Sequence, residues 1–319
     1  SARWLQMVRN LTRPLNRPEL MRELDRRFAV ATAADAERAV DSLARLGADF
    51  VKIRNYPAAS AYFALVRAAS ARGMKVAGHA PPMSFIPTIS DSGFASFEHV
   101  LLDSRNGQLV EGLSTLSGEA RSDLARRLAR NATAWTPTFV SGAVRLLTDT
   151  ELARIVFDTT GARDSTLRFV PRALRDEWRT QLSMRSVDPD TSTDWAAIQR
   201  SSLGVLRDVA AAGVTILAGS DLSVPGLVPG FSLQRELEMM VQDGGISPRE
   251  ALASATVNAV QVLGLAESCG RVAPGYCAEL VLLDRDPLID ISAVRSIRSV
   301  IARGRVYDRK ALAALASPN

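Results

Sequence analysis

The sequence predicts an α/β protein, an incomplete TIM (β/α)8 barrel that carries a small β-sandwich satellite domain. Short apolar runs that end in a polar residue alternate with segments of helical periodicity. The clearest run, residues 214–221, ends at Asp221 and precedes a loop rich in proline and glycine. A strand, an acidic residue, a long loop and a helix, in this order, are how a barrel of parallel strands presents a catalytic group.

Four more apolar runs indicate strands of the same kind. They cover residues 49–54, 75–79, 95–99 and 133–138. The segments between them have helical spacing, and Thr32 with Asp35 resembles the capping box at the start of such a helix. Because helical segments separate the strands, we expect a parallel sheet with helical crossovers.

The second half of the chain predicts a long helical crossover, one more helix and then a change from helical to β-rich segments. Residues 140–212 are helical and charged, and Ser247, Pro248 and Glu250 mark the start of a helix that ends near Gly264. Short β-rich pieces with glycine turns follow. We therefore predict a barrel over 1–265, the strands of a small β-domain over 266–307 and a C-terminal helix or tail over 308–319.

Composition places the chain among ordinary globular proteins. It has 319 residues, of which 47% are hydrophobic and 23% charged. No uninterrupted apolar run is long enough to span a membrane, so we expect no membrane span. The net charge is +5, but the arginines are spread along helical patterns without a basic block, so we expect no nucleic-acid partner.

The two cysteines, Cys269 and Cys277, flank a turn-like stretch. A disulfide across a hairpin would fit this spacing and would indicate an oxidising compartment. Two unpaired, buried thiols are the alternative, and we favour it.

Polar residues at the ends of the predicted strands are the candidates for chemistry. They are Lys52, His79, His99 and Asp221, and the chain has only two histidines. Each alone has a structural explanation, such as a core histidine with a hydrogen-bond partner. Because parallel barrel strands all point the same way, the four side chains are expected to converge on one mouth. Neutral imidazole and carboxylate suit a divalent transition metal, with zinc as the default.

Several longer stretches resemble the amidohydrolase superfamily. The closest branch is the imidazolonepropionase-related group, which includes prolidase-like and dipeptidase-like enzymes. The similar stretches near the C-terminus are Gly219–Ser220–Asp221 with residues 229–237, then 247–264 and 271–288, and those upstream are 47–53, Gly78–His79–Ala80 and Glu98–His99.

The resemblance implies a metal-dependent hydrolase of amide or other C–N bonds. By it, Lys52 would be carboxylated by CO₂ and would bridge two metal ions. His79 and His99 would hold one ion. Asp221 would bind the other ion and act as the general base. The expected cofactor is one or two divalent ions, zinc by default, and the expected substrate is a small molecule or short peptide.

Three residues are further candidates for substrate contacts: Arg54 and Tyr56, which follow the bridging lysine, and Gln234, where many relatives carry a histidine. For Arg54 and Tyr56, surface or packing roles are the favoured reading.

The sequence departs from the family pattern upstream of residue 49. No histidine precedes His79, so the family's His-x-His pair is absent, together with roughly three of the eight strands. We expect an N-terminally incomplete copy of a longer enzyme. The alternative is an inactive or truncated protein of this fold with a binding or structural role. A homo-oligomer stays open, and the resemblance favours an exported or periplasmic parent over a cytoplasmic one.

Overall fold

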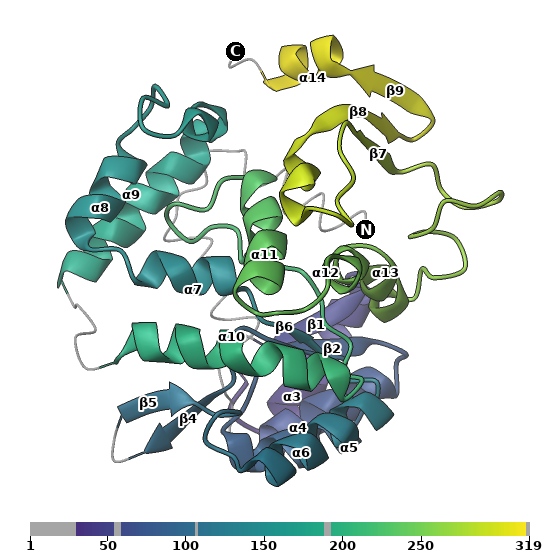
Figure 1. The fold of residues 1–319 in the computed structure, drawn as a ribbon. Helices are drawn as coiled ribbons and strands as arrows, with labels where there is room; N and C mark the ends of the chain where they lie inside the picture. The colour runs from purple at the N-terminus through teal and green to yellow at the C-terminus, as the bar shows by residue number, and fades with distance from the viewer. Residues whose placement is uncertain (1–29, 54–58, 106–107, 188–192, 317–319) are drawn as a thin grey trace. The chain divides into compact units, whose positions relative to one another are not determined.

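The computed structural model describes residues 30–53, 59–105, 108–187 and 193–316. Figure 1 labels its helices and strands and colours them by position along the chain. The chain divides into two compact units. The first consists of Ser1–Glu98 with Arg126–Ala134, and the second of His99–Ala125 with Trp135–Asn319.

The first unit is organised around a parallel sheet. Its strands are β1 (Phe50–Ile53), β2 (Lys75–His79) and β3 (Ser96–Glu98), and β1–β2 and β2–β3 both pair in parallel. The strand order is β1-β2-β3-β6, where β6 (Ala134–Thr136) begins in this unit, and the Ala134 N–H donates to the carbonyl oxygen of Ala95 at 2.9 Å. The predicted α/β class with parallel strands is confirmed, and the described strands form an open sheet.

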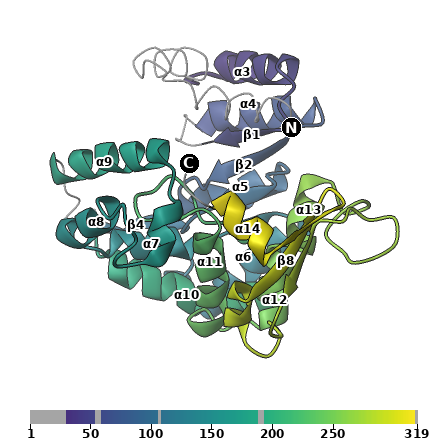
Figure 2. The same ribbon diagram turned by 90° about the horizontal axis from the view of Figure 1, so that it is seen from above.

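Helix α3 (Ala33–Arg45) precedes β1, and two further helices connect the strands. They are α4 (Ala59–Ser70) and α5 (Ile86–Asp91), the last preceded by a short 3-10 turn, η1 (Met83–Phe85). Helix α3 packs on α4, and α4 packs on β2 (Figure 2). The predicted capping box at Thr32 is present, because the Thr32 hydroxyl accepts from the Asp35 N–H while the Asp35 carboxylate accepts from the Thr32 N–H.

The two faces of this sheet differ in burial. The side chains of Val51, Ile53, Val76 and Phe97 are buried and form the apolar core. Lys52, His79 and Glu98, at alternate positions, are more accessible, as the two-residue period of a strand predicts, whereas Ser96 on the same side is buried. The accessible face carries most of the polar residues of the three strands.

Helices dominate the first part of the second unit, where the sequence predicts a helical crossover. Helix α8 packs on α9, and their side chains form an apolar cluster that includes Trp178, which is fully buried. Helix α10 packs on α7. The elements are α7 (Phe139–Arg145), α8 (Asp149–Val156), η2 (Ser165–Phe169), α9 (Arg172–Val187) and α10 (Trp195–Ala211). The last turns of α6 (Gly118–Arg130) belong to the first unit.

The predicted strand over residues 214–221 is reduced to one parallel bridge, between Ile216 and Trp135. Beyond it, the Ala218 N–H donates to the carbonyl oxygen of Ser254 instead of to a strand, and Asp221 has a left-handed backbone. The chain therefore leaves the extended conformation before it reaches Asp221.

The helix predicted from Ser247 is two helices. The capping box at Ser247 and Glu250 is present and starts α12 (Pro248–Ser254), which is followed by α13 (Val257–Leu263). Thr256 lies between them with φ −130° and ψ −95°, which is incompatible with a continuous helix. Helix α11 (Phe231–Gln242) precedes both and packs on α7 and α12.

The C-terminal part contains an antiparallel sheet of β7 (Leu280–Leu283), β8 (Ile297–Ala302) and β9 (Arg305–Asp308), in that order. A 3-10 turn, η3 (Ile291–Arg295), joins β7 to β8, and α14 (Arg309–Ala316) packs on β8 and β9 (Figure 1). A hairpin that the sequence did not predict, β4 (Leu102–Arg105) with β5 (Gln108–Glu111), lies earlier in the second unit. The predicted domain boundaries stay a prediction.

The two cysteines correct one expectation. Cys269 and Cys277 form a disulfide, whereas we favoured unpaired thiols. The turn between them brings their Cα atoms to 5.2 Å, within the range of disulfides. None of the helices in the described ranges has the length and apolar character needed to cross a bilayer.

Candidate functional site

The predicted site residues fall into two groups, one in each unit. In the first unit, Lys52 and His79 lie on the accessible face of the sheet together with Glu98, because all three occupy alternate positions to the buried core residues. His79 pairs with Glu98 across β2 and β3, and Lys52 pairs with Ala77, two residues before His79. These positions are at the C-terminal ends of the three strands, as the sequence predicts.

Lys52 forms an ion pair with Glu98. Its Nζ contacts Oε2 of the Glu98 carboxylate, and the side chains are 45% and 17% exposed. An ammonium group in such a pair has no lone pair for a metal ion. In this arrangement Lys52 is a counter-ion, and its carboxylation stays a prediction.

Gly78 sets the separation of β1 and β2 next to these residues. Its φ is 142°, and a Cβ added there would lie 2.1 Å from the carbonyl oxygen of Ile53. Only glycine permits this approach of the two backbones. The residue that precedes His79 is therefore fixed by packing.

In the second unit, His99 and Asp221 lie together with Thr138. His99 Nδ1 is 2.8 Å from the Thr138 hydroxyl oxygen and 4.0 Å from Oδ2 of Asp221. The imidazole is 25% exposed and the carboxylate 35%, so both are reachable from solvent. This cluster joins two of the predicted ligands that are 122 residues apart in the sequence (221 − 99).

The backbone is left-handed at all three members of this cluster. The φ values are 64° for His99, 52° for Thr138 and 55° for Asp221. Non-glycine residues in this region carry strain of about 1–3 kcal/mol each, which persists only where the surroundings determine the conformation. Such strain is concentrated at functional sites in proteins, so the backbone marks the same residues as the sequence does.

The surroundings hold the cluster by hydrogen bonds. The Trp135 indole N–H donates to the carbonyl oxygen of His99 at 2.8 Å, and the His99 N–H donates to the carbonyl oxygen of Thr136, also at 2.8 Å. Gly219 leaves space for the side chains of Thr136 and Thr138, since a Cβ at Gly219 would lie 2.7 Å and 3.4 Å from their methyl groups.

A buried carboxyl group supports the start of α7, directly after Thr138. Glu236 of α11 is fully buried, and its two oxygens accept from the N–H groups of Phe139 and Val140 at 2.9 and 2.7 Å. Burial raises the pKa of Glu236 to about 8, and the two N–H donors oppose that rise.

The residues predicted to contact substrate add little to the description of the site. Arg54 and Tyr56 lie outside the described residues. Gln234 donates from Nε2 to the carbonyl oxygen of Val294 at 3.3 Å, while its Oε1 is buried without a hydrogen-bond partner. Its amide thus ties α11 to η3, which is a structural contact.

A metal site is not assembled in the described parts of the chain. Within them, no three His, Cys, Asp or Glu side chains are placed to hold one ion together. His99 and Asp221 have the right chemistry for two ligands, since they supply an imidazole and a carboxylate 4.0 Å apart. The donors suit a divalent ion in kind, but the set is incomplete here.

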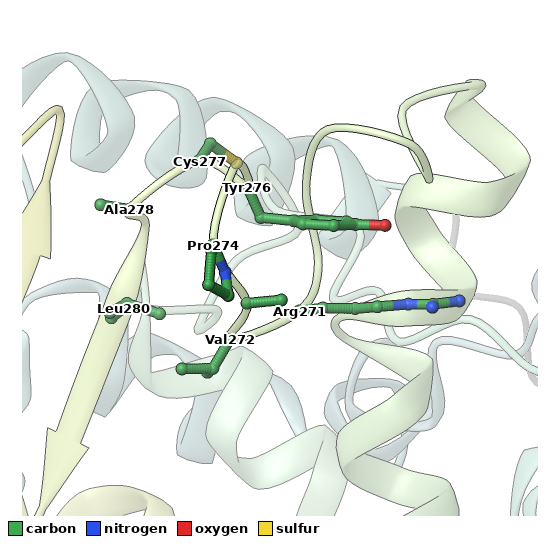
Figure 3. A pocket seen from close by; sticks show the side chains of 8 residues that line it. Arg271, Val272, Pro274, Tyr276, Cys277, Ala278 and Leu280 are labelled. Carbon is green, nitrogen blue, oxygen red and sulfur yellow. The ribbon is translucent and has the colours of Figure 1, made fainter.

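A surface hollow of about 260 Å³ lies elsewhere in the second unit, around the disulfide loop (Figure 3). Arg271, Pro274 and Tyr276 are among the residues that line it. None of the predicted site residues lines this hollow.

Three residues that matter here were not singled out from the sequence: Glu98, Thr138 and Glu236. Glu98 is adjacent to a predicted ligand and ends a strand. Glu236 lies three and four residues before Met239 and Met240, so its place on an apolar helix face was a readable signal. Its partners, about 97 residues away, were not readable.

One family model and several known proteins are similar to this chain. The Amidohydrolase family model matches residues 181–307. Ochratoxinase of Aspergillus niger is 34% identical over 110 residues, which cover 33% of this chain and 22% of that protein. Imidazolonepropionase of Deinococcus deserti is 40% identical over 81 residues, 25% of this chain and 20% of that protein.

Solved structures agree at the level of the fold. The crystal structure of a Xaa-Pro dipeptidase with bound methionine in the active site has a TM-score of 0.59 and 22% identity, and the match covers 88% of this chain and 59% of that one. The chain thus spans about three fifths of that structure, and its sequence matches span about a fifth of the two curated relatives.

The family match over residues 181–307 and the two curated relatives support a resemblance of this chain to the amidohydrolase superfamily. The resemblance noted in the sequence is confirmed at this level.

Proposed function

We propose that this chain carries the active site of a metal-dependent hydrolase that cleaves amide or related C–N bonds in small molecules or short peptides. Support comes from the relatives, since the curated proteins include ochratoxinase and imidazolonepropionases and the solved structures include a Xaa-Pro dipeptidase. The observation that carries the proposal is the cluster of His99, Thr138 and Asp221, where an imidazole and a carboxylate meet on strained backbone.

The proposal assigns roles to Lys52, His79, His99, Asp221 and Thr138. Lys52, as a CO₂ adduct, and His79, His99 and Asp221 are the ligands of one or two divalent ions, zinc by default. When bound, such an ion supplies an activated water and polarises the carbonyl group. Asp221 accepts a proton at its carboxylate and passes it to the leaving nitrogen. Thr138 orients the His99 ring through its contact with Nδ1.

The Lys52–Glu98 ion pair sets a condition for this role of Lys52. The amine must lose its proton, and its contact with Glu98, before it can react with CO₂. A carbamate beside the Glu98 carboxylate would place two negative groups together, which is favourable only with cations between them. Carboxylation and metal loading are therefore expected to depend on each other.

Metal content is the experiment that tests the proposal. The protein is loaded with zinc and bicarbonate, freed of excess ion, and measured by elemental analysis beside K52A, H79A, H99A and D221A. D243N is the matched control, because Asp243 is exposed and ends α11. We expect at least one equivalent of zinc per chain in the parent and in D243N, and a loss of bound zinc in K52A, H79A, H99A and D221A. If every variant retained its zinc, the proposed set of ligands would be wrong.

Hydrolysis is assayed on the same preparations. Dipeptides, N-acyl amino acids and cyclic amides are the first substrates, because they sample the C–N bonds that the proposal includes. Release of product by the loaded parent, absent in D221A, is the expected result. Metal binding without hydrolysis of any class would leave the metal site and remove the proposed reaction.

An inactive protein of this fold is the second candidate. It is favoured by one observation: the described residues do not bring three metal-binding side chains together. This candidate predicts metal-free protein after loading, with an unchanged thermal transition in all four variants. The same elemental analysis therefore decides between the two.

The cellular compartment of the protein and its oligomeric state are also proposals. The Cys269–Cys277 disulfide supports an exported or periplasmic protein, because disulfides persist in oxidising compartments. A homo-oligomer is tested by the mass of the purified protein in solution.

A further inference from the structure

The start of α7 is capped in an unusual way. Thr138 is its N-cap residue, and the Thr138 carbonyl oxygen accepts from the Ser141 N–H at 3.0 Å. An N-cap threonine ordinarily also uses its hydroxyl to accept from one of the first N–H groups of the helix. The Thr138 hydroxyl makes no such bond. Instead, it lies 2.8 Å from His99 Nδ1.

Glu236 takes over the capping role. Its two carboxyl oxygens accept from the first two N–H groups of α7, those of Phe139 and Val140. Glu236 comes from another helix and is fully buried, although burial of a carboxyl group is unfavourable unless its hydrogen bonds are satisfied. An apolar side chain would fill the same space without that cost. The position is therefore explained by what the carboxyl group does for α7.

The consequence reaches the imidazole of His99. With α7 capped by Glu236, the Thr138 hydroxyl oxygen is available to accept from His99 Nδ1–H. Oδ2 of Asp221, 4.0 Å from Nδ1, favours the proton on that nitrogen. A neutral ring with its proton on Nδ1 carries its lone pair on Nε2, the form in which it can bind a cation or accept a proton there.

We infer that Glu236 is a positioning residue: by capping α7 in place of Thr138, it commits the Thr138 hydroxyl to His99 and holds His99 with its lone pair on Nε2. The left-handed backbones of Thr138 and His99 fit this role, because they persist only where contacts on several sides determine them. The use of this tautomer in catalysis rests on the proposed function, whereas the tautomer itself does not.

The tautomer is measured directly by nuclear magnetic resonance with ¹⁵N-labelled histidine, without metal or substrate and at a pH where the rings are neutral. The chain has two histidines, so H79N assigns both ring systems. We expect the protonated nitrogen of His99 to be Nδ1 in the parent and in T138S, which keeps the hydroxyl. In T138V, which lacks it, we expect a shift toward the Nε2-protonated form.

E236Q tests the remote residue. Each oxygen of the Glu236 carboxyl group can accept a hydrogen bond whether or not the group carries a proton, whereas the amide NH2 group of glutamine cannot accept one. One contact with α7 is therefore lost in E236Q, and the Thr138 hydroxyl is drawn to the helix. We expect the His99 signals of E236Q to move toward those of T138V. E238Q, on the same helix, is the matched control, because Glu238 pairs with Arg295 and not with α7; its His99 signals should match the parent.

Two results would overturn the inference: a parent with the proton on Nε2, or an E236Q protein whose His99 signals equal those of the parent. If E236Q fails to fold, the T138S and T138V pair still decides the Thr138 step, and E236D supplies a shorter carboxylate for the remote step. Zinc affinity is a second readout, with a roughly 10–100-fold loss expected in E236Q and T138V but not in T138S. An absence of hydrolysis would remove the proposed function and leave the tautomer result standing.

Discussion

His99 Nδ1 lies 4.0 Å from Oδ2 of Asp221, and both residues adopt left-handed backbone conformations. Neither residue is a glycine, so each conformation is held against an intrinsic preference. The two side chains face each other because their backbones do not continue the extended geometry of the segments that precede them. The strained backbone conformations are thus what brings the imidazole and the carboxylate together.

Replacement of Asp221 by asparagine should separate activity from folding. Asparagine tolerates the left-handed region about as well as aspartate does, so D221N should keep the thermal transition of the parent within a few degrees. In the proposed hydrolysis Asp221 is the base, and because asparagine cannot accept the proton, we expect kcat/KM to fall by about 10²–10⁴. D243N, assayed in parallel, should retain full activity. A fully active D221N would remove Asp221 from the general-base role.

Gly78 should not tolerate a side chain. In G78A the new methyl group would lie 2.1 Å from the carbonyl oxygen of Ile53, at a φ of 142°. We expect a loss of about 2 kcal/mol or more in the free energy of unfolding, measured by urea denaturation. G118A is the control, because that glycine has open space and starts a helix, and it should be neutral or slightly stabilising. Equal stability of the two variants would contradict the close approach of β1 and β2.

Glu236 should make stability fall as the pH rises from about 5 to 8. Its pKa is raised from 4.5 to about 8, so the folded state keeps a proton that the unfolded state releases over this range. The unfolded state then binds fewer protons, and the free energy of unfolding decreases with pH by at most about 1.4 kcal/mol per pH unit. Urea denaturation of the parent and E236Q at several pH values measures this.

The comparison with E236Q isolates the Glu236 contribution, because Glu111, whose pKa burial also raises, is present in both proteins. We expect a flatter pH dependence in E236Q. Parallel curves for the two proteins would show that Glu236 titrates alike in the folded and unfolded states.

Arg295 should stabilise the junction of η3 and α11. Its guanidinium group holds both oxygens of Glu238, whose side chain is 8% exposed, and it lowers the pKa of that carboxyl group. Because Arg295 is 39% exposed, solvent screening limits the loss in R295A to about 1–2 kcal/mol. R285A removes an exposed pair with Asp290 and should cost about 0.5 kcal/mol or less. A loss in R295A no larger than in R285A would contradict this assignment.

Local signals predicted much of the fold. The capping boxes at Thr32 and Ser247 are present because such motifs depend on residues three apart in the sequence. The parallel pairing of β1, β2 and β3 followed from the alternation of helical and strand patterns. The run at 214–221 forms only one parallel bridge, with Trp135, because the Ala218 N–H donates to the carbonyl oxygen of Ser254, a partner that no local pattern specifies.

The candidate site was predictable only in part. The sequence located Lys52, His79, His99 and Asp221 at strand ends, and the structure brings His99 and Asp221 together. It could not locate Thr138 or Glu236 as their supports, because those contacts join residues 39 and 97 positions apart. Likewise, the partner of Lys52 is set by the register of strands β1 to β3.

The two faces of the first sheet differ in polarity, and this difference determines which positions of the sheet tolerate substitution. One face of β1, β2 and β3 is committed to the apolar core, and the alternate positions carry the polar residues. Ser96 is buried on that side, but Lys52, His79 and Glu98 are accessible, so substitutions at these three positions can accumulate without disturbing the packing beneath the helices. New reactivity can therefore be selected one position at a time on a foundation that stays constant, which makes this face the natural target for a mutational library.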